Sequence, residues 1–123
     1  MDKQTEITLH DRYVLVYVSG DALPPTEIKM TILRALEQAI ESDLHIIFRR
    51  EEFVKEYATE TDFYDFAKLV HECGFKKKIA LVFPEKMHTD TINVIEMAAA
   101  NIGIKCRLFS AMDDALRWLD NNA

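Results

Sequence analysis

The first residues of the chain alternate between apolar and polar positions with the period of a β-strand. Residues 6–9 follow this pattern, residues 12–18 form a more apolar strand-like run, and only His10 and Asp11 separate the two, so the sequence predicts an antiparallel hairpin. The second strand has two rather apolar faces, with Val14, Val16 and Val18 on one and Tyr13, Leu15 and Tyr17 on the other. We therefore expect this strand to be central in a sheet that is covered on both sides.

Apolar positions three and four residues apart predict a helix that opens at Pro24 or Pro25, since an early helical position needs no N–H donor. A second helix is expected to begin at Thr59 or Thr61, as a capping residue, and to end at Gly74. The expected core positions of these helices are Ile28, Ile32, Leu33, Leu36 and Ile40, then Phe63, Phe66, Ala67 and Val70.

The last third of the chain predicts two more helices. Thr89 can cap the first of them and Gly103 can end it. Ser110 stands three residues before Asp113, a variant of the capping box, and is expected to open the last helix. The expected core positions are Ile92, Ile95, Ala98, Ala99 and Ile102, then Ala115, Leu116 and Leu119.

Short apolar runs at residues 44–48, 79–83 and 105–109 lie between the helices and predict buried strands. Strands that alternate with helices form right-handed crossovers, which place the helices on the faces of a parallel sheet. The sequence thus predicts an α/β fold: a five-stranded, mostly parallel sheet with an antiparallel N-terminal hairpin, and four main helices covering its faces. A chain of 123 residues has the size of one domain, so residues 1–123 are expected to share one core.

Charge and cysteine usage narrow the classes of function. A net charge of −6 argues against binding to a nucleic-acid backbone. The dense basic run of residues 76–78 is expected to stabilise the negative end of the dipole of the preceding helix. The alternative is a patch that binds phosphate or a membrane. The polar N-terminus predicts neither a signal peptide nor an integral membrane segment, and hence a cytoplasmic protein. Cys73 and Cys106 are expected to be reduced thiols in the core.

The candidate site follows from the expected topology, because ligands of open parallel sheets bind beyond the carboxyl ends of the strands. Residues 49–58 form the longest irregular segment, and long loops in compact domains are usually functional or disordered. The candidate residues for binding a ligand or partner are Arg49, Arg50, Phe53, Tyr57, Phe63, Phe66 and His88. The alternative for Phe53 and Tyr57 is that both fold back onto the core.

Motifs that carry catalysis are missing from the sequence. It has no glycine-rich phosphate loop, no G-x-S-x-G elbow, no H-E-x-x-H and no C-x-x-C, and its four His residues share no ligand-like spacing. Glu51 and Glu52 could form an acid/base pair, but beside Arg49 and Arg50 the alternative is a solvated salt-bridge cluster. We therefore predict no catalytic residue, no metal site and no cofactor.

The second half of the chain resembles a known family. Lys77 to Phe83, Arg107 to Phe109 and Asp114 to Leu119 are similar to the SpoIIAA-like group of the STAS and Sec14-related fold, whose small bacterial members show a basic residue before an "IALV" strand and close with an "EEAL-x-WL" helix. Phosphorylated members carry a Ser in the turn between the third strand and the second helix. Here only Thr59 and Thr61 precede that helix, so they are the candidate phospho-switch, with a plain structural cap as the alternative.

The resemblance implies a non-catalytic regulatory module that binds a protein partner. Two alternatives stay open: a carrier or sensor of a small apolar molecule, in the manner of Sec14-like lipid binding, and a small enzyme of unknown class. An enclosed pocket lined by Phe63 and Phe66 would favour the carrier. A homodimer is also expected, because an open sheet leaves the backbone groups of its edge strands unpaired.

Overall fold

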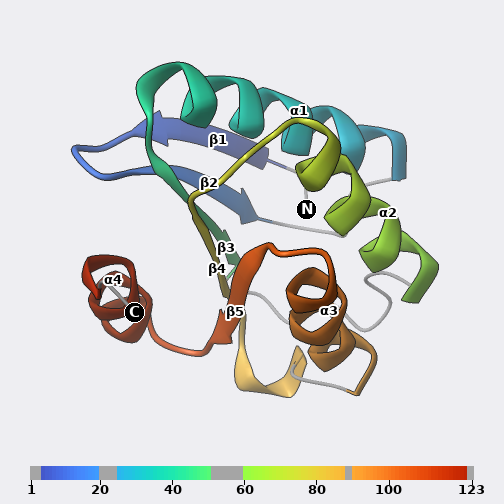
Figure 1. Cartoon of the computed structure of the whole chain (residues 1–123). Helices are drawn as coiled ribbons and strands as arrows, with labels where there is room; N and C mark the ends of the chain where they lie inside the picture. Colours follow the sequence, from blue (N-terminus) through green and yellow to red (C-terminus); the bar gives the residue numbers. More distant parts are fainter. Residues whose placement is uncertain (1–3, 20–24, 51–59, 88–89, 122–123) are drawn as a thin grey trace.

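The computed structural model describes residues 4–19, 25–50, 60–87 and 90–121 (Figure 1). Within these residues the elements are, in chain order, β1 (Gln4–Leu9), β2 (Tyr13–Ser19), α1 (Pro25–Ser42), β3 (His45–Arg50), α2 (Glu60–Glu72), β4 (Lys78–Val82), the short 3₁₀ helix η1 (Glu85–Met87), α3 (Asp90–Asn101), β5 (Lys105–Phe109) and α4 (Met112–Asp120). The predicted α/β fold is confirmed, as are its hairpin and the order of its main elements. No described helix is long and apolar enough to cross a membrane.

The sheet has the strand order β1-β2-β3-β4-β5 across the described residues. β1 and β2 pair antiparallel as predicted, and each later strand joins its predecessor in parallel. Because every crossover leads to the next strand in the same direction, α1, α2 and α3 gather on one face of the sheet and α4 covers the other (Figure 1).

Each face of the sheet has its own apolar cluster. Val14, Val16 and Ile46 point into the larger cluster beneath α1, α2 and α3. Ile47 and Ala80 point into the smaller cluster, where Ala115 and Leu119 of α4 are buried. β2 therefore lies inside the sheet with side chains in both clusters, as its two apolar faces predicted.

Two of the predicted helix ends are confirmed, the predicted cap Ser110 is wrong, and of the two alternative caps for α2 Thr61 is excluded while Thr59 lies outside the described residues. Gly74 and Gly103 follow α2 and α3 with φ of 75° and 79°, the left-handed conformation in which glycine commonly ends a helix. α2 begins at Glu60, so Thr61 lies inside its first turn and is not the cap. The N-cap of α4 is Ala111, with no side-chain cap hydrogen bond, so Ser110 does not cap this helix.

Three apolar side chains expected in the core are exposed. Ile40 lies in the last turn of α1, and Ile102 directly follows the end of α3. Cys73 is also exposed, just after the end of α2. Cys106 is buried as predicted, and burial with the nearby Glu96 raises the pKa of its thiol.

Lys78 does not stabilise the end of the preceding helix, as was expected for the basic run. Its side chain is buried, and its ammonium donates hydrogen bonds to the carbonyl oxygens of Trp118, at 2.7 Å, and Asn121. Nζ also lies 5.3 Å from the centre of the Trp118 ring. This cation therefore serves the carboxyl end of α4, on the other face of the sheet, and not the end of α2. Burial lowers its pKa.

His45 links the start of β3 to the start of β4. Its Nδ1 accepts a hydrogen bond from the backbone N–H of Lys78 at 3.0 Å, so the ring must be unprotonated at that nitrogen. Burial, followed by the charges of Lys77 and Lys78, lowers the pKa of His45 below its usual 6.5.

This arrangement predicts an acid-dependent loss of stability. Because the unfolded chain takes up the His45 proton at higher pH than the folded chain, the free energy of unfolding falls as the pH drops below 6.5 and levels off once the folded ring also titrates. In His45→Asn, whose amide oxygen can accept the same hydrogen bond without titrating, this part of the loss should vanish. Urea unfolding at pH 7.5, 6.5 and 5.5 checks this, and parallel pH profiles for the two proteins would contradict it.

Candidate functional site

The carboxyl ends of β2, β3, β4 and β5 meet at one edge of the sheet, because these strands are parallel. β3 runs two residues further toward this edge than the sequence predicted. Arg49 pairs with Tyr17 and Val82 in the neighbouring strands, and Arg50 pairs with Val18. The two arginines are thus strand residues, not loop residues, and the sheet fixes their direction.

Successive strand residues point to opposite faces, so the two arginines separate. Arg49 is half-buried on the α4 face, whereas Arg50 lies on the face covered by α1, α2 and α3 and is only 2% exposed. Both make interactions within the structure. A buried guanidinium carries a large desolvation cost and is rare outside well-matched surroundings. The expected solvated cluster is therefore wrong for Arg50, which is built into the interior.

Aromatic side chains lie beside Arg50 on the helix-covered face. Phe48 and Phe66 meet edge to face with ring centres 5.9 Å apart. Phe66 and Phe83 are buried in the larger cluster, so both are core residues. Phe48, Phe66 and Phe83 therefore belong to the packed core on this face of the sheet.

Tyr64 is a residue of this edge that sequence reasoning missed. It lies in the second turn of α2, the helix that starts at the carboxyl edge, and 54% of it is exposed. The signal was in the sequence, because Tyr64 breaks the three- and four-residue spacing of Phe66, Ala67 and Val70 and so faces away from the core. We name Arg49, Arg50 and Tyr64 the carboxyl-edge site.

Several predicted site residues lie outside the described part of the chain. These are Phe53, Tyr57, Thr59 and His88. Thr61 and Phe63 belong to the first turn of α2, but their side chains are not among those described. In the described residues no three His, Cys, Asp or Glu side chains gather in a way that could hold a metal ion. The candidate site therefore rests on two arginines and one exposed tyrosine.

Arg49 and Tyr64, the two of these residues that reach the surface, have the chemistry of a recognition surface. Tyrosine and arginine are the side chains enriched at the energetic centres of protein interfaces, since each combines a large contact area with directed hydrogen bonds. Arg49 adds a positive charge to a chain whose net charge is −6. The edge is thus suited to a partner that presents acidic and aromatic groups.

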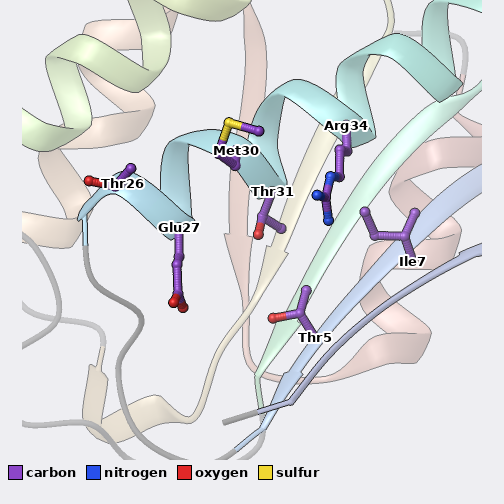
Figure 2. A pocket seen from close by; sticks show the side chains of 7 residues that line it. All are labelled: Thr5, Ile7, Thr26, Glu27, Met30, Thr31 and Arg34. Atoms are coloured by element: carbon purple, nitrogen blue, oxygen red, sulfur yellow. The ribbon is translucent and has the colours of Figure 1, made fainter.

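A separate groove lies between β1 and α1, with a volume of 460 Å³. Figure 2 shows Glu27, Thr31 and Arg34 reaching from α1 toward the side of β1 that carries Thr5 and Ile7. Its lining is a mixture of hydroxyl, charged and apolar side chains. It lies open along the outer strand of the sheet and is not the enclosed apolar pocket that a carrier would need.

Comparisons with known proteins match the fold. No family model matches the sequence, and no curated protein matches it. A solved structure described as an anti-sigma factor antagonist from Mycobacterium paratuberculosis has a TM-score of 0.56 to this chain, at 19% sequence identity, with 98% of this chain and 96% of that chain covered. At this identity the likeness concerns the fold, and it extends over nearly the whole of both chains. The chain thus has the STAS-like α/β fold that its second half resembles in sequence.

Proposed function

We propose that this chain is a non-catalytic regulatory module of one STAS-like domain, which acts in the cytoplasm and binds a protein partner through the carboxyl-edge site. The observation that carries the proposal is the likeness of fold to an anti-sigma factor antagonist over 98% of the chain. The geometry supports it with an exposed tyrosine and a half-buried arginine on a rigid edge.

The carboxyl-edge site is held by the sheet and the core. Arg49 and Arg50 are held in β3 between β2 and β4, and α2 rests on the core through Phe66, Ala67 and Val70. A preorganised surface loses little conformational freedom when a partner docks, so more of the contact energy appears as affinity. Tyr64 then presents its ring to the partner from a fixed helix.

Partner binding is tested with protein purified from its host by native mass spectrometry. The proposal predicts that a protein partner is retained, and that Tyr64→Ala weakens the binding of that partner at least tenfold, as the loss of an interface anchor does. Ile40→Ala is the matched control. Ile40 is 46% exposed near the carboxyl end of α1, toward the opposite edge of the sheet, so its loss should leave affinity unchanged.

Two results would contradict the proposal. If Tyr64→Ala and Ile40→Ala both bind the partner as the wild type does, the carboxyl edge is not the docking surface. If the wild type retains a lipid or another small apolar molecule and no protein, the carrier alternative replaces the regulatory module. Turnover of a substrate would select the enzyme.

Phosphorylation at the start of α2 is proposed as the control of this site. A phosphate on Thr59 or Thr61 would stand near the positive end of α2 and close in sequence to Arg49 and Arg50. It would compete with the acidic groups of a partner for Arg49, because Arg50 is buried. We therefore expect Thr59→Asp or Thr61→Asp to weaken partner binding while the matching alanine variants bind as the wild type does. Equal affinity for all four variants, measured by isothermal titration, would exclude the switch.

A further inference from the structure

The two outer strands of the sheet differ in whether a side chain binds their outer backbone groups. β5 is one outer strand, and the backbone N–H of Leu108 points out of it to the side-chain Oε1 of Glu96, at 2.6 Å. Glu96 belongs to α3, which packs beside β5. A carboxylate bound to the edge of a strand blocks the ladder that another strand would extend. This edge is thus closed by a side chain of the chain itself.

β1 is the other outer strand and has no comparable cover among the described residues. It pairs with β2 over its whole length, from Gln4 to Leu9, and no other described strand lies on its outer side (Figure 1). Leu9 is 53% exposed, although it is a large apolar residue on a strand. An outer strand with an exposed apolar side chain is a template for pairing with another strand.

The groove above β1 is self-complementary in charge. Along α1, Glu27 and Arg34 stand on either side of Met30 and Thr31, and Figure 2 shows both charged side chains reaching toward β1. A two-fold axis through the middle of this groove would bring the Glu27 of each copy to the Arg34 of the other. Ile7 lines the groove from below, and the same axis would pass between Ile7 of one copy and Ile7 of the other.

The sequence of β1 favours one register around that axis. Centred on Ile7, an antiparallel pair sets Ile7 opposite Ile7 of the second copy, Thr5 opposite Leu9, and Glu6 opposite Thr8. Centred on Glu6, it would set two carboxylates directly opposite each other, which is unfavourable. Centred on Thr8, it would leave fewer residues of β1 paired.

We propose that two copies of this chain associate through their β1 strands, antiparallel and centred on Ile7, so that the two sheets become one continuous sheet. Leu9 is then covered by the second copy, and the Glu27 and Arg34 side chains pair across the axis. This surface lies along the β1 edge of the sheet and is distinct from the carboxyl-edge site, so both can be occupied together.

The register is tested with single cysteines in a Cys73→Ser background, because Cys73 is exposed. Directly opposed residues of an antiparallel pair have Cα atoms about 4.5–5.5 Å apart, within reach of a disulfide, whereas diagonal neighbours at about 7–8 Å are too far. Under mild oxidation, Ile7→Cys should therefore form a covalent dimer. Glu6→Cys and Thr8→Cys, the matched controls, should stay largely monomeric on a denaturing gel.

The charge pairing is tested by reversal and rescue in sedimentation velocity. Glu27→Lys or Arg34→Glu alone turns two attractive contacts into two repulsive ones, so we expect the dissociation constant of the dimer to rise about tenfold. The double variant, Glu27→Lys with Arg34→Glu, should restore the wild-type constant. Both side chains are exposed, so these variants keep the fold.

Three outcomes overturn the proposal. The first is a monomer boundary for the wild type at every concentration. The second is a dimer whose strength the single and double reversals leave unchanged. The third is cross-linking through Glu6→Cys or Thr8→Cys in preference to Ile7→Cys. None of these results bears on the partner test at Tyr64, so the two proposals fail separately.

Discussion

Replacing Lys78 with alanine is expected to lower the free energy of unfolding by about 2–4 kcal/mol. The change removes a buried stem from β4 and two hydrogen bonds, to the carbonyl oxygens of Trp118 in α4 and of Asn121 just after it. It also removes the cation that lies over the Trp118 ring. Urea unfolding followed by the fluorescence of Trp118, the single tryptophan of the chain, measures the loss.

Two companion variants separate the causes. Lys78→Met keeps most of the stem, so it should lose only about 1–2 kcal/mol, the part owed to the hydrogen bonds. Lys77→Ala is the matched control: Lys77 is half-exposed and pairs with the exposed Asp43 at 3.5 Å, a contact worth about 0–1 kcal/mol. If Lys77→Ala costs as much as Lys78→Ala, the buried lysine does not anchor α4.

Replacing Trp118 with alanine is expected to lower the free energy of unfolding by about 2 kcal/mol. A fully buried tryptophan would cost about 3–5 kcal/mol, but this ring is half-buried. It lies with its centre 5.6 Å from that of Phe109, while Lys78 and Arg107 both approach its face. Thermal unfolding followed by circular dichroism is the measurement, since the fluorescent group is gone.

Arg117→Ala is the matched control for Trp118→Ala. It is the neighbouring residue in α4, is largely exposed, and pairs with Asp114 at 3.1 Å. Its removal should shift stability by less than about 0.5 kcal/mol. If Trp118→Ala has the same melting temperature as Arg117→Ala and the wild type, the indole ring does not contribute to the packing that holds α4 on the sheet.

The α/β fold could be predicted because its signals are local. The valines of β2, the apolar run of β4 and the glycines after α2 and α3 each report on their own surroundings, through spacing or through a left-handed turn. The hairpin followed from two runs separated by two residues. Parallel pairing of the later strands then followed from the alternation with helices.

Other features depend on contacts that no local pattern contains. Lys78 reads as part of a solvated basic run, yet it is buried because α4 returns to β4 forty residues later. The sequence predicted a loop at Arg50, because a charged residue does not continue an apolar run. Pairing of β3 with β2 and β4 nevertheless extends the strand to this residue. Ser110 has the spacing of a cap, but the chain starts α4 one residue too late for it to serve.

The candidate site could be placed only in part. The carboxyl edge follows from the topology of any open parallel sheet, so its location was predictable. The division of Arg49 and Arg50 between opposite faces depends on the length of β3, which the sequence underestimated. Tyr64 carried a readable signal, whereas the closure of the β5 edge by Glu96 could be found only from the packing of α3.

The most direct test of the account is hydrogen–deuterium exchange on the chain alone and with its partner bound. If the partner docks at the carboxyl-edge site, protection should increase at Arg49, Arg50 and the first two turns of α2. The opposite edge, at His45 and Lys78, should exchange as it does in the free chain. Protection confined to α4 or to that opposite edge, with Tyr64 and its neighbours unchanged, would contradict the proposed function.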